Sequence, residues 1–120
     1  MLKMPKYVKP YDTKEKHLPG CNYCGPGTNV RRRVREGVKP MNDIDKACFR
    51  HDLDTESRGP QRAGTDPKKI RASDMRLARA AKKIALAPET SKTERALAWV
   101  VYRAMRMNKW RKSRGGKVDL

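Results

Sequence analysis

The sequence has 120 residues, of which 30 are Lys or Arg and 13 are Asp or Glu, so its formal net charge is +17. This length predicts one domain, 1–120, with one modest hydrophobic core, and it excludes a large multidomain enzyme. No apolar run approaches the roughly 20 residues of a membrane span, and the first residues lack the apolar core of a signal peptide. We therefore expect neither a transmembrane nor a conventionally secreted protein, and the charge favours polyanionic partners.

The segment before the first long helix is predicted to be irregular. Residues 1–17 form a basic arm, because prolines interrupt them and no hydrophobic period is sustained. Residues 21–28 (CNYCGPGT) are predicted to be a tight loop, since Gly and Pro follow the second cysteine. Residues 31–40 (RRRVREGVKP) read as a basic connector that ends at a proline.

Three helices are predicted after this connector. The first begins at Asn42, a good N-cap residue, and the second begins at 66–67, where an Asp cap precedes a proline. The third begins at the capping box SKTE (91–94) and runs to about Trp110, and 111–120 is expected to be a frayed basic tail. The apolar stripes that define these helices are Ile44, Ala47, Cys48, His51 and Thr55; Ile70, Asp74, Leu77, Ala81 and Ile84; and Leu97, Val100, Val101, Ala104 and Met107. The predicted fold class is therefore all-α.

Two polar residues interrupt the apolar stripes of the first two helices. His51 and Asp74 each lie on an inner face, and antiparallel packing of these faces would bring them together. A buried imidazole held by a carboxylate suits general-base catalysis. The alternative is a core histidine beside an aspartate that caps a helix beginning at 73–74.

Asp52 follows His51 but points about 100° around the helix, which directs it toward the glycine loop. That loop offers the backbone carbonyls of Tyr23, Gly25 and Gly27, and glycine leaves the approach to them open. Several carbonyl oxygens with one carboxylate form a hard oxygen site, which suits calcium better than zinc.

These segments resemble the phospholipase A2 family. CNYCGPG (21–27) is similar to its calcium loop, and DKACFRHD (45–52) is similar to its active-site helix. PMNDIDKACFRHD (40–52) is closer to the viral form, found in the minor capsid proteins of parvoviruses. The motif of that form is N-x-x-D-x-A-x-x-x-H-D, matched here by Asn42, Asp45, Ala47, His51 and Asp52.

The resemblance implies a role for each matched position. His51 would be the general base, Asp74 would orient it, and Asp52 would bind calcium together with the loop carbonyls. The reaction would be hydrolysis of the sn-2 ester of membrane phospholipids. Cys24 and Cys48 match a disulfide of secreted members that the parvovirus form lacks, and a reducing compartment would keep them as thiols. Thr55 replaces the usual tyrosine, which predicts a looser His–Asp pair and lower activity.

Two other functions use the same residues. Cys21, Cys24, Cys48 and His51 have the spacing of a three-cysteine, one-histidine zinc site, which would make the chain a basic nucleic-acid-binding module. Alternatively, the fold is kept without activity, in a basic capsid or genome-packaging protein.

The basic residues predict where partners would bind. We expect an electrostatic surface that prefers anionic phospholipid membranes and also contacts nucleic acid, with capsid proteins as further partners. The resemblance implies a virion or host-cell location for a viral protein. Otherwise we expect an intracellular location, because no signal peptide is seen. The residues expected on this surface are Arg31, Arg32, Arg33, Lys68, Lys69, Lys82, Lys83, Arg103 and Arg106.

Overall fold

The structure is a computed structural model of the chain, and it describes residues 6–11, 18, 20–25, 28–55 and 66–107. These residues contain four helices and no strand, which confirms the all-α class. The helices are α1 (Val30–Arg35), α2 (Asp43–Thr55), α3 (Pro67–Leu86) and α4 (Lys92–Arg106). None of the described helices is both long enough and apolar enough to span a membrane.

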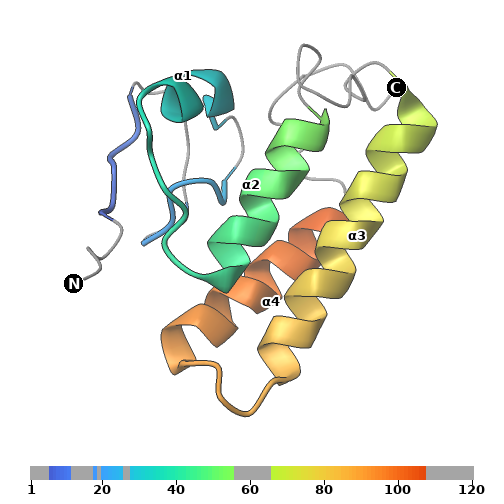
Figure 1. Cartoon of the computed structure of the whole chain (residues 1–120). Coiled ribbons are helices and arrows are strands. Elements are labelled where there is room, and N and C mark those ends of the chain that lie inside the picture. The colour runs from blue at the N-terminus through green and yellow to red at the C-terminus, as the bar shows by residue number, and fades with distance from the viewer. Residues whose placement is uncertain (1–5, 12–17, 19, 26–27, 56–65, 108–120) are drawn as a thin grey trace.

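The three long helices form the main body of the domain. α2 and α3 run side by side in opposite directions, and α4 crosses behind them (Figure 1). Alanines line α3 on its buried side, and Ala78, Ala81 and Ala85 are almost fully buried in one core cluster with Ala98 of α4. Such small side chains let two helix backbones approach closely, so the core is thin but continuous.

The predicted helix starts are confirmed. The Asn42 side chain accepts a hydrogen bond from the Asp45 N–H at the start of α2, and Asp66 caps α3 by accepting from the Lys68 N–H. Ser91 caps α4 by accepting from the Glu94 N–H. The Glu94 carboxylate accepts from the Ile44 N–H at 3.0 Å, so this residue also ties the start of α4 to the start of α2.

The connector predicted over 31–40 is wrong, because its first half is the short helix α1. Asn29 caps α1 by accepting from the Arg32 N–H. Two backbone hydrogen bonds close the C-terminal end of α1. The Gly37 N–H donates to the Val34 carbonyl, and the Val38 N–H donates to the Arg33 carbonyl. Gly37 has a φ of 74°, the left-handed conformation that such a helix end requires and that glycine adopts without strain.

The apolar stripe predicted for α4 is partly wrong. Val100 and Met107 are 45% and 56% exposed. The helix is rotated so that Ala98 and Met105 are buried in their place, beside Leu97, Val101 and Ala104 as predicted. The small Ala98 allows close contact with the alanine-rich side of α3. A prediction that selects the most hydrophobic residues for the buried face misses this small residue. The predicted tail, 111–120, lies outside the described residues.

Candidate active site and metal-binding loop

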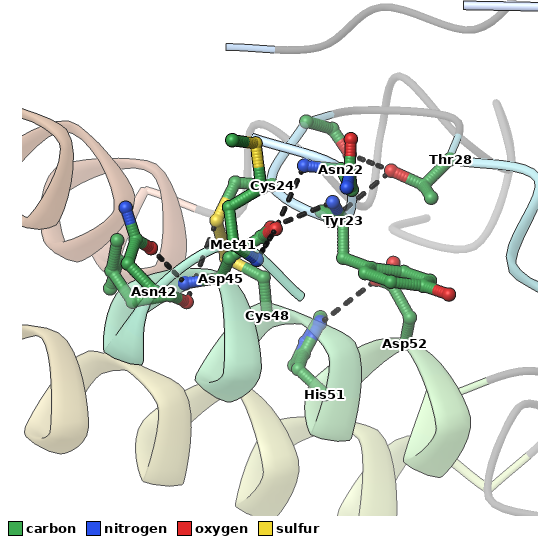
Figure 2. Close-up of a disulfide and its surroundings, with 12 residues drawn as sticks. Asn22, Tyr23, Cys24, Thr28, Met41, Asn42, Asp45, Cys48, His51 and Asp52 are labelled. Atoms are coloured by element: carbon green, nitrogen blue, oxygen red, sulfur yellow. Dashed lines mark hydrogen bonds and ion pairs between the residues drawn. A yellow bond between two sulfur atoms is a disulfide. The ribbon is translucent and has the colours of Figure 1, made fainter. Parts of the chain in front are cut away.

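Asp45 attaches the loop of residues 21–25 to α2. Its fully buried carboxylate accepts hydrogen bonds from the backbone N–H groups of Tyr23 at 2.7 Å, Asn22 at 2.8 Å and Met41 at 2.9 Å (Figure 2). Without this acceptor, several backbone donors would be buried and unsatisfied. The sequence predicts for Asp45 only a match to the motif of the viral form and a favourable charge at a helix start, with no role in holding the loop. Its spacing with Cys48 and Asp52, which puts all three on one face of α2, is the signal for its further role.

Asn22 links this loop to the N-terminal arm. Its fully buried side chain donates to the carbonyls of Lys6 at 2.7 Å and Lys39 at 2.9 Å, and it accepts from the Val8 N–H at 2.7 Å. The arm, described over 6–11, has no helix or strand there, as predicted. Its position is therefore fixed by a buried amide, which no local pattern in the sequence indicates.

Tyr23 fills the space between the loop and α2. Its side chain is fully buried, its ring packs against Phe49 with centroids 4.5 Å apart, and its hydroxyl donates to the Val38 carbonyl at 2.7 Å. Burial raises the pKa of Tyr23 to about 12, so the hydroxyl stays protonated and remains a donor. These contacts immobilise the residue whose backbone oxygen is a candidate metal ligand.

Cys24 and Cys48 form a disulfide between the loop and α2, with Cα atoms 5.2 Å apart (Figure 2). Cys21 keeps a free, buried thiol, and burial raises its pKa to about 12. The zinc site expected from Cys21, Cys24, Cys48 and His51 is not assembled. Its sulfur ligands Cys24 and Cys48 are bonded to each other, and His51 has a carboxylate partner on α3 instead.

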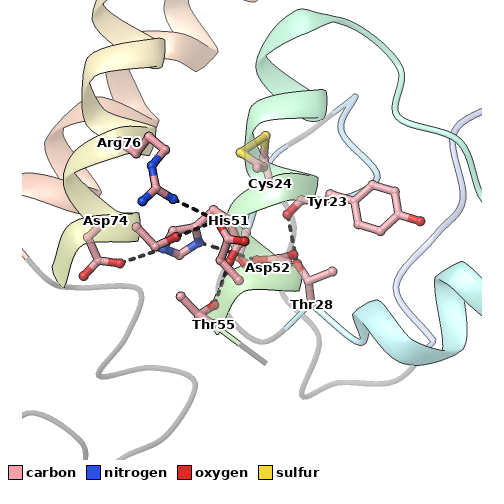
Figure 3. Close-up of polar contacts among 12 residues, drawn as sticks. Tyr23, Cys24, Thr28, His51, Asp52, Thr55, Asp74 and Arg76 are labelled. Carbon is pink, nitrogen blue, oxygen red and sulfur yellow. Dashed lines mark hydrogen bonds and ion pairs between the residues drawn. A yellow bond between two sulfur atoms is a disulfide. The ribbon is translucent and has the colours of Figure 1, made fainter. Parts of the chain in front are cut away.

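Two of the expected oxygen ligands, the carbonyls of Tyr23 and Gly25, lie close to each other. Thr28 donates its hydroxyl to the carbonyls of Tyr23 at 3.2 Å and Gly25 at 3.1 Å, so these two oxygens converge on one point. The buried Asp52 extends from α2 toward the segment carrying Thr28 (Figure 3). The third expected carbonyl, that of Gly27, lies outside the described residues.

His51 and Asp74 meet between α2 and α3. His51 Nε2 lies 2.6 Å from Asp74 Oδ1, and both residues are only 4% exposed (Figure 3). The other ring nitrogen, Nδ1, lies 3.7 Å from Asp52 Oδ1. Because a carboxylate only accepts, the short contact places the hydrogen on Nε2 and leaves the Nδ1 lone pair directed to the side of Asp52. Asp74 lies in the middle of α3, so the alternative in which it caps a helix is wrong.

Asp54 holds the two helices in register beside this pair. Its Oδ2 accepts from the Ser73 hydroxyl at 3.3 Å and from Arg76 Nη1 at 3.1 Å, which are the residues one before and two after Asp74. From the sequence, Ser73 is considered only as a possible helix start and Arg76 only as a basic residue off the inner stripe, so this contact is not predicted. The signal in the sequence is an acidic residue three positions after His51, together with a Ser and an Arg on either side of Asp74.

Thr55 is buried at the end of α2. Its buried hydroxyl donates to the His51 carbonyl at 2.9 Å, within the last turn of α2. The expectation of a looser pair is not met by the geometry, because His51 and Asp74 still make a 2.6 Å contact. The lower activity expected from Thr55 stays a prediction.

A small pocket reaches His51 from the groove between α2 and α3. It has a volume of about 70 Å³, and Ala47, Leu77 and Ala80 supply its apolar wall while Arg50 and Arg76 lie at its edge. This volume is enough for a few water molecules beside His51.

The basic residues divide into exposed and buried ones. Arg33 is fully buried, so its assignment to the basic surface is wrong. Its guanidinium donates to the carbonyls of Val8 at 3.1 Å and Lys9 at 3.0 Å, and it lies 4.9 Å from the ring of Tyr11. It holds the N-terminal arm against α1, a role that a run of three arginines does not reveal. The other predicted positions are exposed, namely Arg31, Arg32, Lys68, Lys69, Lys82, Lys83, Arg103 and Arg106.

Comparison with known protein families agrees with this geometry. Residues 14–83 match the sequence model of the Phospholipase A2-like domain, which is more than half of the chain. The chain therefore belongs to this family, the parvovirus type of phospholipase A2-like domain, as the motifs indicate. The match includes His51, Asp52 and Asp74 and ends within α3, so α4 lies beyond it. Neither the curated proteins nor the solved structures gave a match.

Proposed function

We propose that this chain is a calcium-dependent phospholipase A2 that hydrolyses the sn-2 ester of membrane phospholipids. The observation that carries the proposal is the buried His51–Asp74 contact of 2.6 Å, with Asp52 on the other side of the imidazole. Membership of the phospholipase A2-like family supports the substrate class.

The chemistry assigned to the chain is a proton relay. Nδ1 of His51 takes a proton from the attacking water, and the resulting imidazolium returns it to the departing lysophospholipid alkoxide. Asp74 keeps the hydrogen on Nε2 and stabilises the imidazolium while it is charged. Asp54 acts indirectly, because its bonds to Ser73 and Arg76 fix the position of α3 beside α2.

The residues around Asp52 fit a calcium ion by their donor chemistry. A buried carboxylate faces the segment in which the carbonyl oxygens of Tyr23 and Gly25 converge, and all these donors are hard oxygens. Asp52, Tyr23 and Gly25, with Gly27, would hold the ion. Calcium bound there would polarise the ester carbonyl and stabilise the developing oxyanion.

Fatty-acid release from liposomes tests the proposal. We expect release that requires calcium at about 0.1–1 mM, as expected for a site with one carboxylate, and that His51→Gln abolishes. Asp43→Asn, at an exposed position on the same helix, is the matched control and should retain full activity. Release that persists in a calcium chelator, or in His51→Gln, would show that the mechanism is wrong.

We also propose that the enzyme works on anionic membranes. The exposed Lys and Arg residues of α3 and α4 support this preference. In addition, Arg71 and Arg106 line a pocket beside Asp74, so positive charge lies close to the proposed catalytic pair. Vesicles with an anionic lipid should bind more tightly than neutral vesicles, and added salt should weaken the difference. Equal binding to both vesicle types would contradict the proposal.

The biological setting that we propose is membrane breach by a virus-associated protein, located in a virion or in its host cell. The parvovirus type of the family supports it, with capsid proteins as partners. The second candidate function is nucleic-acid binding by the same exposed basic residues, for which the net charge of +17 is the supporting observation. Strong nucleic-acid binding without hydrolysis at any calcium concentration would favour the packaging function.

A further inference from the structure

Three buried side chains converge where the loop of residues 21–25 meets the first half of α2. The Sγ atoms of Cys21 and Cys24 and a carboxylate oxygen of Asp45 all lie within 4.8 Å of one another. Cys48 lies next to this group, because its sulfur is bonded to that of Cys24. All four residues are 0% exposed. The proposed catalysis uses none of these sulfur atoms.

The four residues form two pairs with the spacing of a structural metal site. The loop provides Cys21-x-x-Cys24, and α2 provides Asp45-x-x-Cys48, whose members lie one helical turn apart on one face. Pairs separated by two residues, one on a loop and one on a helix, are a common way to surround zinc. In the disulfide form this arrangement offers only one thiol and one carboxylate.

Reduction changes what the cluster offers to a metal. A thiol reductant such as glutathione transfers two electrons and two protons to the Cys24–Cys48 bond, and it is itself oxidised to a disulfide. The chain then has three thiols beside the Asp45 carboxylate. Three thiolates and one carboxylate oxygen form a four-ligand set suited to zinc and poorly suited to calcium.

We propose that the reduced chain binds one zinc ion through Cys21, Cys24, Cys48 and Asp45. Each thiol releases its proton to solvent as it binds the metal. The Asp45 oxygens already accept from three backbone N–H groups, and a carboxylate has about four acceptor positions, so one position remains for the metal.

Zinc then replaces the disulfide as the link between the loop and α2. In an oxidising environment, Cys24–Cys48 is the link, and in a reducing one the metal connects the same two segments. The inference goes beyond the proposed function and does not rest on it, because the zinc ligands include neither His51 nor Asp52. A chain that has to work in both environments would keep its loop attached in each.

Metal binding by the full chain tests the inference. The protein is prepared without metal, either oxidised or reduced with a phosphine, and titrated with Zn²⁺, with Co²⁺ as a spectroscopic probe. We expect one zinc per chain in the reduced form and none in the oxidised form. Reduced protein should also show a zinc-dependent rise in Tm and, with Co²⁺, intense thiolate-to-metal absorption.

Two variants identify the ligands. Cys21→Ser preserves the Cys24–Cys48 disulfide, so the oxidised variant should fold and keep the wild-type Tm to within a few degrees. Its reduced form should bind zinc at least about 100-fold more weakly, since even outer contacts of metal ligands are worth about 10–100-fold. His51→Gln should leave zinc affinity unchanged.

Failure of the zinc inference can be distinguished from failure of the proposed lipase function. The inference is wrong if the reduced wild-type chain binds no zinc, or if Cys21→Ser binds it as tightly as the wild type. Loss of zinc in His51→Gln would show the three-cysteine, one-histidine set instead. Zinc binding in a chain that releases no fatty acid would overturn the proposed function alone.

Discussion

The α2–α3 pair and the loop-and-arm region (6–11, 20–25 and α1) are built by different means. In the helix pair, periodic apolar faces pack together and carry His51 and Asp74 into contact. In the loop-and-arm region, backbone groups are held by buried polar side chains, chiefly those of Asp45, Asn22 and Arg33. The helix pair positions the proposed proton relay, and the other region positions the oxygen donors. Damage to either region should therefore produce a distinct failure.

Asp74→Asn tests the helix pair alone and should have the largest effect. An asparagine cannot stabilise the imidazolium by charge, and it can present its NH₂ group to Nε2, so the wrong tautomer of His51 becomes accessible. We expect turnover to fall by about 10²–10⁴-fold. Calcium affinity, measured by titration calorimetry, should change little, because Asp74 is outside the proposed ligand set.

Asp52→Asn is the matching change on the other side of the imidazole. It should weaken calcium binding first and lower turnover only at limiting calcium. If Asp74→Asn weakened calcium binding as much as Asp52→Asn does, the assignment of separate roles to the two carboxylates would be wrong.

Asp45→Ala tests the attachment of the loop and should have the next largest effect. It leaves three backbone N–H groups without their acceptor, and each buried donor left unsatisfied costs about 1–3 kcal/mol. We expect the free energy of unfolding, measured by urea denaturation, to fall by about 3–5 kcal/mol. Asp43→Ala removes an exposed carboxylate from the same helix turn and is the control. A similar small loss in both variants would contradict the role of Asp45.

The contrast between the regions explains what could be predicted from the sequence. The starts of α2, α3 and α4 follow from caps next to periodic apolar residues, and the His51–Asp74 contact follows from two polar residues on facing stripes. These signals are local in the sequence. The only assumption about the tertiary structure is that the two helices pack in an antiparallel way. The family motifs indicate His51, Asp52 and the loop carbonyls from the sequence alone.

The loop-and-arm region could not be predicted in this way. Asn22 bonds to residues 14 to 17 positions away, and Arg33 bonds to carbonyls 24 and 25 positions away. Such contacts depend on which distant segments the fold brings together. In addition, an arginine within a basic run is expected to be exposed, whereas Arg33 is buried. α1 was missed for a related reason, since only two of its residues, Val30 and Arg33, are buried.

Asn22→Ala tests the link between the arm and the loop and should have a moderate effect. It removes three hydrogen bonds, of which two reach the arm, so we expect stability to fall by about 2 kcal/mol. Calcium affinity should fall as well, because the next residue contributes a proposed carbonyl ligand. Removal of residues 1–9 should have a similar effect on calcium affinity. Unchanged affinity in both variants would show that the arm does not position the loop.

Alkaline pH should weaken the loop-and-arm region gradually, and just above pH 9 this is the smallest effect that we predict. Burial raises the pKa of Cys21 and of Tyr23 to about 12, from ordinary values near 9 and 10. The native state therefore keeps protons that the unfolded chain releases, so stability is fully present below about pH 9 and is lost as pH rises toward 12. The slope is at most about 1.4 kcal/mol per pH unit for each group.

Cys21→Ser assigns the first part of this loss. In the oxidised, metal-free protein, urea denaturation at a series of pH values should show a flatter decline between pH 9 and 10 for the variant than for the wild type. Tyr7→Phe changes a partly exposed tyrosine and should leave the decline unchanged. The decline above pH 10 should persist in Cys21→Ser, because Tyr23 remains. An identical pH profile for Cys21→Ser and the wild type would mean that the thiol is not buried as described.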